Sequence, residues 1–582
     1  IQLFQRSNCP FLLDSNEIKY IFGFMGAALM FTACSDFLDV ATQNGLDPDQ
    51  ANDAERFCNA AYASLMNQRD VKLWAWGDVR SDDAYKGGGG TNDGYTEHCY
   101  ETGTHIVTTF GEPDGYWFVQ YCGISRVNSA LNALNIVSEK EFPNKVTRQA
   151  EMRFLRGHFY FLLKILFKNI PFVDETVPEH QYQFISNVEL TDVEMWDKII
   201  ADFKFAFDNL PEKQADLGRA NKYAAAAYLA KAYLYKAYRQ NEKYEVTSID
   251  VDDLEEVVKY TGEVLKSNYG LETDFAYNFM PEFENGKESI FAIQFSKDDG
   301  TMFGNLNFAD FLSVPQGLGC CDFHKPSQNL VNAFKTSKGL PMFKVNNGVY
   351  SENYDIANYS KSKAADPRLF STVAMDGFPY KYNEDLLFQN SWNRNPEVYG
   401  NYASLKENVD PSCDCFVNLS PYYANSMNKI LIRFADVLLI RAEALIELNR
   451  EPEALPLINQ VRQRAQDSAN GMVNYSDPDL KPVMEVALYE DGNNCTWNQD
   501  FARYALRWER RLEFAMENMR FFDLVRWGIC SETMNKYFQS EKARRSYLKE
   551  AVFTKNKNEY VPIPQQQIGY SKDLYKQNYG WK

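Results

Sequence analysis

Histidine and basic charge are both scarce in this chain. Five histidines occur among 582 residues, and 61 lysines and arginines face 79 aspartates and glutamates, for a formal net charge of −18. A surface without a basic surplus has little with which to neutralise phosphates, so we predict no nucleic-acid partner. There is no Gly-x-Ser-x-Gly elbow, and with so few histidines a nucleophilic triad has no obvious base.

Motifs for phosphates and metals are missing as well. The tetraglycine at 87–90 is not followed by Gly-Lys-Ser/Thr and is therefore no Walker loop. His98, Cys99 and His105 match no standard zinc spacing, and Asn92-Asp93-Gly94 departs from a calcium-binding EF-hand loop. We predict no cofactor, no metal site and no catalytic residue. A glycosidase-type carboxylate pair stays open, although no carboxylate has a context that would raise its pKa.

The 11 cysteines do not form a recognisable framework. Cys320-Cys321 and Cys413-Asp414-Cys415 are spaced too tightly for a zinc ribbon. We expect most cysteines to be small buried hydrophobic residues, with room for one local bridge. Aromatic residues, in contrast, are abundant: 36 Tyr, 41 Phe and 9 Trp. Aromatic rings beyond the needs of a core often serve as flat platforms for sugars or peptides.

The first 33 residues predict a processing segment. Residues 1–17 look like upstream sequence or a mis-assigned start. From Lys19 a cation precedes an apolar run of roughly 14 residues, which is short for a bilayer span but suits a signal peptide. Phe31-Thr32-Ala33-Cys34 has the form of a lipobox, so we predict that Cys34 is acylated and anchors the chain to a membrane. The alternative is a buried cysteine behind a cleaved secretory signal. No later stretch has the length and apolar character of a transmembrane helix.

Helical periodicity recurs along the remaining chain and fades in one region. Apolar residues return every three or four positions in several segments: 148–167, 191–210, 219–238, 254–267, 430–448 and 453–466. The last two, joined by a short turn, have about the 34-residue size of a tetratricopeptide unit. Between 269 and 428 glycine, proline and asparagine increase, and 289–295 has the pattern of a short strand. We predict a mostly α fold in which tetratricopeptide-like hairpins scaffold an irregular, loop-rich lobe with a few short strands.

The densest pattern is Arg507–Gly528, RWERRLEFAMENMRFFDLVRWG. Its spacing predicts one continuous helix that ends at Gly528, with its charged residues paired along wet flanks. Glu509 and Glu513 lie one turn apart and could form an acid/base pair. Each has an arginine within a turn, which lowers its pKa and makes it a poor general acid. We therefore interpret the helix as scaffold.

This stretch resembles the signature of the SusD/RagB family, whose usual form is close to ERRxELAFEGxRFFDLxRWG. Asn518-Met519 stands where the family often has Gly-His, a change that we expect the helix to tolerate. Further segments are similar to family motifs, so that the resemblance extends over essentially the whole mature chain: Cys34 to Asp39, 148–167, 434–466 and 560–581.

The resemblance implies a nutrient-binding outer membrane lipoprotein that is exposed at the cell surface and is not an enzyme. It implies capture of an oligosaccharide or polysaccharide and delivery to a SusC-like TonB-dependent transporter. A peptide ligand of the RagB type, a surface glycoside hydrolase and a pure protein-interaction scaffold are the alternatives. The expected organisation is a leader at 1–33, an N-terminal SusD-like helical region at 34–268, an irregular ligand-binding lobe at 269–428 and a C-terminal SusD/RagB helical region at 429–582.

Candidate ligand contacts come from three aromatic and polar stretches. Aromatic rings stack on the apolar face of a pyranose, and Asp, Arg and Asn take its hydroxyl groups. The alternative is that Trp74 and Trp76 are core residues and that Asp82 caps a helix or turn. The candidates are mainly on the loop at 73–95, with three from the irregular lobe: Trp74, Trp76, Asp78, Arg80, Asp82, Asp83, Tyr85, Phe323, Trp392 and Arg394.

Overall fold

The computed structural model describes residues 51–66, 72–301, 304–342, 362–471, 479 and 481–581. The predicted leader and the lipidation site Cys34 lie outside the described residues. Among the helices of these ranges, none is long and apolar enough to cross a membrane.

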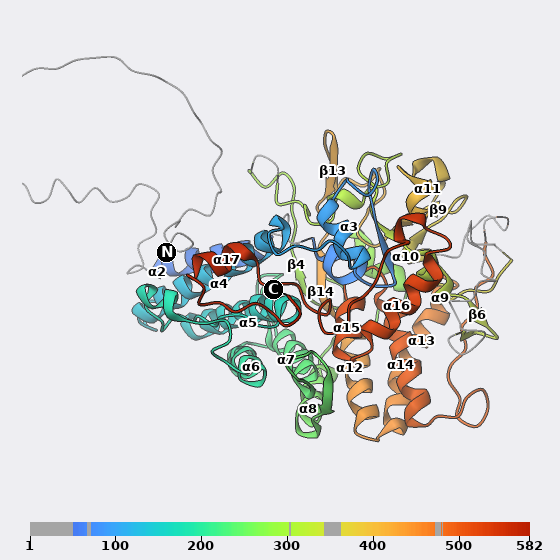
Figure 1. The fold of residues 1–582 in the computed structure, drawn as a ribbon. Helices are drawn as coiled ribbons and strands as arrows, with labels where there is room; N and C mark the ends of the chain where they lie inside the picture. Colours follow the sequence, from blue (N-terminus) through green and yellow to red (C-terminus); the bar gives the residue numbers. More distant parts are fainter. Residues whose placement is uncertain are drawn as a thin grey trace, which may run out of the picture.

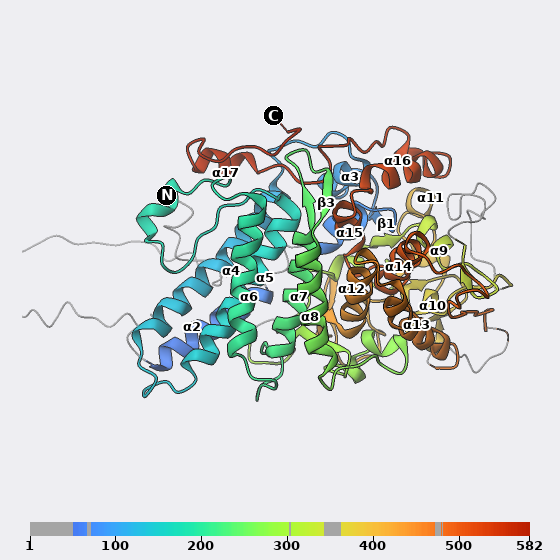
Figure 2. The same ribbon diagram turned by 90° about the horizontal axis from the view of Figure 1, so that it is seen from below.

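The N-terminal part is a layer of helices in which neighbours in sequence pack against each other (Figure 2). Thr191 caps one of them through a capping box with Glu194. Small residues allow close approach, since Gly157 lies against the ring of Phe203 and α7 buries Ala224. The helices are α2 (Ala51–Ala63), α4 (Gly111–Ile136), α5 (Lys145–Phe167), α6 (Asp192–Asn209), α7 (Lys222–Ala237) and α8 (Val251–Leu265).

The hairpins that are separated in sequence meet in space. Helix α12 (Phe434–Glu447) packs against α8 as well as against α13 (Glu451–Ser468) and α14 (Gln499–Phe514), so both helical parts form one continuous scaffold (Figures 1 and 2). The mostly α, hairpin-based fold is therefore confirmed. One boundary is wrong: the residues before α12 form strand β14 (Lys429–Arg433) instead of a helical turn, because they pair with β4 (Ser289–Ile293).

The region between α8 and α12 is irregular, as predicted. Within the described residues every sheet has two strands. Short helices interrupt it at α9 (Gln328–Ala333), α10 (Leu369–Thr372) and α11 (Pro396–Tyr399). The paired strands are β1 (Ala84–Gly87) with β5 (Phe323–Pro326), β6 (Thr336–Ser337) with β7 (Leu340–Pro341), β8 (Val373–Ala374) with β11 (Ala403–Ser404), β9 (Pro379–Tyr380) with β10 (Asn383–Leu387), and β12 (Phe416–Leu419) with β13 (Tyr422–Asn425).

The stretch Arg507–Gly528 is not one helix. Helix α14 ends at Phe514 and α15 (Arg520–Arg526) starts after a break in which Met516 and Asn518 have positive φ angles of 62° and 68°. Asparagine tolerates this left-handed conformation better than most residues. The predicted capping glycine is confirmed in its conformation, since Gly528 has φ 71°.

Most charged residues of this stretch are buried, not on wet flanks. Glu509 and Glu513 are fully buried, and Glu513 accepts hydrogen bonds from Arg433 (2.5 Å) and Arg368 (2.8 Å). Burial alone would raise the pKa of Glu513, but the arginines Arg464, Arg433 and Arg368 hold it well below its usual value. A carboxylate held ionised in this way cannot act as a general acid, which supports the scaffold interpretation.

The C-terminal segment returns across the first helices (Figure 2). It carries α16 (Cys530–Glu541) and α17 (Gln565–Tyr570), and the backbone N–H of Val561 donates to the carbonyl of Leu166 in α5 (3.0 Å). It also contacts β2 (Tyr238–Gln240), which pairs with β3 (Val246–Ile249), because the hydroxyl of Tyr560 donates to Gln240 (2.7 Å). The backbone N–H of Val552 donates to the carbonyl of Thr102 at the end of α3 (Tyr95–Thr102) (2.9 Å).

Candidate functional site

Most of the first candidate loop lies inside the protein. Trp74 is fully buried; its indole N–H donates to the carbonyl of Ala309 (3.1 Å), and its ring stacks on His324. Trp76 is 2% exposed. The alternative that both tryptophans are core residues therefore holds in the structure. The other five members of this group, Asp78, Arg80, Asp82, Asp83 and Tyr85, are also buried.

The polar groups of this loop are occupied by residues far along the chain. Arg520 donates to Asp82 (2.9 Å) and Arg511 donates to Asp83 (2.7 Å), so both aspartates join the first loop to α14 and α15. Burial by itself would raise the pKa of Asp82, but Arg511 and Arg520 lower it to about 2. As a correction to the sequence prediction, none of the seven side chains from Trp74 to Tyr85 is accessible to a ligand in this structure.

One buried cluster contains a histidine hydrogen-bonded to carboxylates, as a catalytic triad does, but it does not have the chemistry of a triad. His324 Nε2 lies 3.0 Å from Asp78 Oδ2, and His324 Nδ1 lies 2.7 Å from Glu407 Oε1. Burial opposes protonation, but Glu407 and Asp78 together raise the pKa of His324 to about 10. The imidazolium donates both protons to carboxylates, so it keeps no lone pair with which to activate a nucleophile.

The candidates from the irregular lobe come closer to the surface. Trp392 is half-buried, with its ring edge-on to Tyr380 and Phe388. Its indole covers Gly317 so closely that a Cβ there would lie 2.4 Å from the ring. Glycine is therefore required at 317, and the loop at 315–321 is held directly against Trp392.

Arg394 connects this loop to the tetraglycine segment. Its Nη1 donates to Asp93 (2.9 Å) and its backbone N–H donates to Asp322 (2.7 Å). Phe323 is 6% exposed and lies beneath Gly88, where a Cβ would be 2.6 Å from its ring. The structure thus brings Phe323, Trp392 and Arg394 together, with Phe323 as support and the other two at the surface.

The tetraglycine segment is folded around an internal cation. The ammonium group of Lys86 donates to the carbonyls of Gly87 (2.9 Å), Gly90 (3.0 Å) and Asp93. Lys86 itself is fully buried. Glycines allow this turn because Gly87, Gly88 and Gly90 have positive φ angles.

The β12–β13 hairpin belongs to the same surface as Trp392 and Arg394. It projects beyond α3 in Figure 1. Tyr422 is 41% exposed, and its ring lies 5.1 Å from that of Phe311. The ring of Tyr423 covers Gly319 as Trp392 covers Gly317. These aromatic residues were missed in the sequence, although Ser420-Pro421, a turn-forming pair between two short runs with aromatic residues, is a signal that would have pointed to them.

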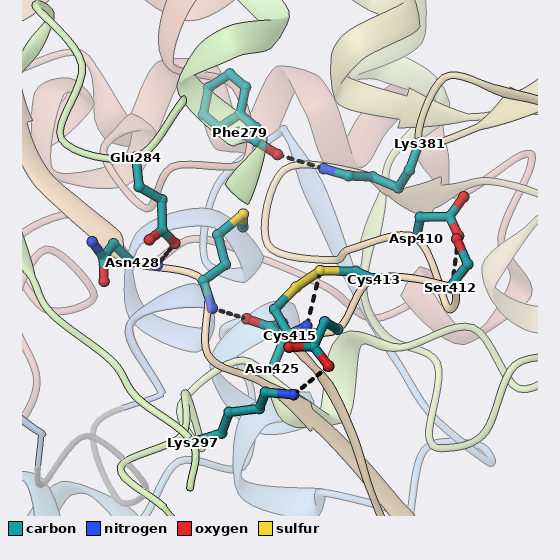
Figure 3. Close-up of a disulfide and its surroundings, with 12 residues drawn as sticks. Phe279, Glu284, Lys297, Lys381, Asp410, Ser412, Cys413, Cys415, Asn425 and Asn428 are labelled. Carbon is teal, nitrogen blue, oxygen red and sulfur yellow. Dashed lines mark hydrogen bonds and ion pairs between the residues drawn. A yellow bond between two sulfur atoms is a disulfide. The ribbon is translucent and has the colours of Figure 1, made fainter. Parts of the chain in front are cut away.

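A disulfide joins Cys413 and Cys415 at the start of this hairpin (Figure 3). The ammonium group of Lys297 pairs with Asp414 between them (2.6 Å), and Ser426 on the other side donates to the carbonyl of Cys415 (3.0 Å). A second disulfide joins the neighbours Cys320 and Cys321. The sequence analysis allowed for one local disulfide, whereas the structure has two.

We call the surface formed by residues 87–93, 311–321, 389–395 and 416–425 the loop face.

Within the described ranges, no group of three or more His, Cys, Asp or Glu side chains could hold a metal ion. The polar groups of the loop face are a salt bridge, amides and hydroxyls, which suit the hydroxyl groups of a neutral ligand better than a cation.

Comparison with known proteins gives this architecture a family. A model described as "SusD family" matches residues 287–581, which is half of the chain. The chain belongs to the SusD family. A second family model, described as "Starch-binding associating with outer membrane", matches residues 36–234. The suspected SusD/RagB membership is confirmed.

Relatives of this SusD-family protein align over nearly its full length. SusD-like protein P2 of Formosa agariphila is 24% identical over 97% of this chain and 100% of its own. A SusD-like protein of Bacteroides ovatus is 24% identical over 88% of this chain and 83% of its own.

Solved structures show the same fold. A SusD homolog from Bacteroides thetaiotaomicron superposes with a TM-score of 0.68 at 20% identity, covering 92% of this chain and 97% of the other. A structure described as a laminarin-binding SusD-like protein superposes with a TM-score of 0.59 at 21% identity, covering 91% and 100%.

Proposed function

We propose that this SusD-family protein is a surface-exposed outer membrane lipoprotein that captures glycans and delivers them to a SusC-like TonB-dependent transporter. Cys34 would carry the lipid anchor, and the helical scaffold would dock on the transporter. The relatives support the ligand class, since one similar structure is described as laminarin-binding and another as a surface glycan-binding protein from Bacteroides fluxus. An anchored receptor beside a pore raises the local concentration of its ligand.

The observation that carries the proposal is the loop face. It combines the half-buried Trp392 and the 41% exposed Tyr422 with the polar pair Arg394–Asp93, whose side chains are 36% and 40% exposed. Aromatic faces next to hydrogen-bonding groups are the requirement for sugar recognition. Of the remaining candidates, Phe323 lies directly beneath this surface, under Gly88.

We infer that the protein binds without cleaving. Neither matched family model describes an enzyme. The buried cluster at His324 has no lone pair to offer, and Glu513 is held ionised among arginines. These three observations support a capture role over hydrolysis.

The test is titration calorimetry of the chain from Ser35 to Lys582 against polysaccharides, oligosaccharides and short peptides, with the same mixtures assayed for cleavage products. Saturable binding to a glycan without products is the expected result. Formation of products would overturn the non-enzymatic role, and binding of peptides alone would assign the protein to the peptide-binding alternative.

The anchor and the partner are tested separately. Cys34→Ala should move the protein from the membrane fraction to the soluble fraction, and its retention in membranes would contradict the anchor. Purification of the lipidated protein from its native membrane should bring down a TonB-dependent transporter in equal amount. Recovery without any transporter would contradict the delivery role.

A further inference from the structure

The loop at 315–321 is enclosed by two aromatic rings. Trp392 covers Gly317 and Tyr423 covers Gly319, each so closely that only glycine fits. The amide N–H of Gly317 also donates to the carbonyl of Trp392 (3.2 Å). The position of this loop relative to both rings is therefore defined by direct contact, and the loop ends at the Cys320–Cys321 disulfide.

The disulfide rests on a rigid base. Cys321 is 6% exposed and belongs to the same buried cluster as Trp74 and Phe323. Its N–H donates to the carbonyl of Leu312 (3.3 Å), and its carbonyl accepts from Arg394 (3.4 Å). Cys320 packs on this cluster with one side and stays half-exposed. The ring closed by this bond contains the two sulfur atoms, the Cβ and Cα atoms of both cysteines and the peptide C–N bond between them. Its edge of sulfur and Cβ atoms presents a small, polarisable apolar surface.

The polar groups around this surface carry almost no net charge. Arg394 is neutralised by Asp93 at 2.9 Å. Gln316 and Ser391 are exposed and neutral. The face therefore complements a neutral, hydroxyl-rich partner, and its described residues offer no unpaired cation for a sulfate or carboxylate.

We propose that the Cys320–Cys321 disulfide is itself a sugar-contacting element of the loop face. Together with the rings of Trp392 and Tyr422 it forms an apolar strip that stacks on the C–H faces of a neutral pyranose chain. The Asp93–Arg394 pair and the neighbouring amides take the hydroxyl groups. This assignment rests on the proposed capture of glycans, and it adds the contact and the substrate class: uncharged glycans, not sulfated or uronate-rich ones.

The experiment compares wild-type protein with the double variant C320S/C321S by titration calorimetry against matched neutral and acidic polysaccharides. Mass spectrometry of the wild-type protein first establishes the Cys320–Cys321 bond. Loss of one stacking contact should weaken binding of the neutral glycan about five- to tenfold. The matched control is Cys495→Ser, which alters an unbridged cysteine in the turn before α14 and should leave affinity unchanged.

Two further measurements distinguish a folding defect of the double variant from the loss of its sugar contact. Circular dichroism reports whether the double variant is folded. If it is not, wild-type protein is titrated with and without a phosphine reductant, with alkylation to identify which cysteines have been released. Weaker binding of the neutral glycan by folded protein without the Cys320–Cys321 bond is the expected result in either format.

The outcomes distinguish the two proposals. Unchanged affinity in folded protein lacking the bond, or absence of the bond in wild-type protein, overturns the disulfide contact and leaves glycan capture intact. Preference for the acidic polysaccharide overturns the substrate class. Failure of wild-type protein to bind any glycan overturns the proposed function itself.

Discussion

Asp78 accepts a hydrogen bond from the backbone N–H of Asn518 at 2.9 Å, across 440 positions of sequence. Asn518 lies in the break between α14 and α15, and a Cβ on Gly77 would collide with its carbonyl at 2.0 Å. The first loop is thus inserted at the point where the signature stretch departs from a helix. A residue predicted to hold ligand instead holds the scaffold together.

The variant Asp78→Ala should destabilise the protein by about 3 kcal/mol, because it removes a buried acceptor and leaves the His324 imidazolium with one carboxylate. Chemical denaturation measures the change. The control Asp414→Asn alters a pair whose aspartate is 95% exposed and should change stability by less than about 1 kcal/mol. Equal stability of the two variants would contradict the role of Asp78.

The pH dependence of stability should carry a contribution from His324. Its pKa in the folded protein, about 10, lies above the ordinary value of 6.5, so folding is favoured by its protonation. This stabilisation is complete below pH 6.5 and is lost as the pH rises through 10. The difference in unfolding free energy between wild type and His324→Gln should therefore shrink from pH 6.5 to pH 10. A constant difference would show that the imidazolium pair is not formed.

The variant Trp74→Ala should lower stability by about 3–5 kcal/mol, because the indole is fully buried and its N–H is hydrogen-bonded. Any loss of glycan affinity should disappear when binding is measured on the folded fraction at low temperature. Thermal unfolding and calorimetry report the two effects. If the variant kept its stability but lost glycan binding, Trp74 would be a ligand contact and not a core residue.

In contrast to Trp74→Ala, the variant Trp392→Ala should lower glycan affinity more than it lowers stability. The ring is half-buried and belongs to the proposed ligand surface, so we expect about a tenfold loss of glycan affinity in protein that still folds. The control Tyr504→Ala removes another exposed ring, on α14, outside the loop face. Similar affinities of the two variants would contradict the placement of the site on the loop face.

The variant Glu513→Gln tests the scaffold interpretation of the signature stretch. It removes the negative charge that Arg433, Arg464 and Arg368 share in the interior, so about 3–5 kcal/mol of stability should be lost. Chemical denaturation is the measurement. The control is Asp500→Asn on the same helix, where the aspartate side chain is 88% exposed. Normal stability combined with altered turnover of a glycan would instead support an enzymatic role.

The helical scaffold could be predicted because its signal is local. Periodicity in segments such as 148–167 and 191–210 decides which residues form a helix and which face is apolar, and α5 and α6 agree with it to within a few residues. The family signature and the irregular character of the middle region were recognisable for the same reason. The domain boundaries at 268 and 428 stay a prediction.

The position of each polar or aromatic side chain was not a local property. Asp82 and Asp83 have the composition of a sugar-binding loop, but their partners Arg511 and Arg520 lie more than 400 positions away and draw them inside. Phe311 and Tyr422 are also distant in sequence. Their rings meet only because the β12–β13 hairpin folds over the segment 311–321. The sequence alone determined the scaffold and the family, because hydrophobic periodicity acts over a few residues. The tertiary structure alone decided which rings and charges face solvent, because burial is set by contacts between distant segments.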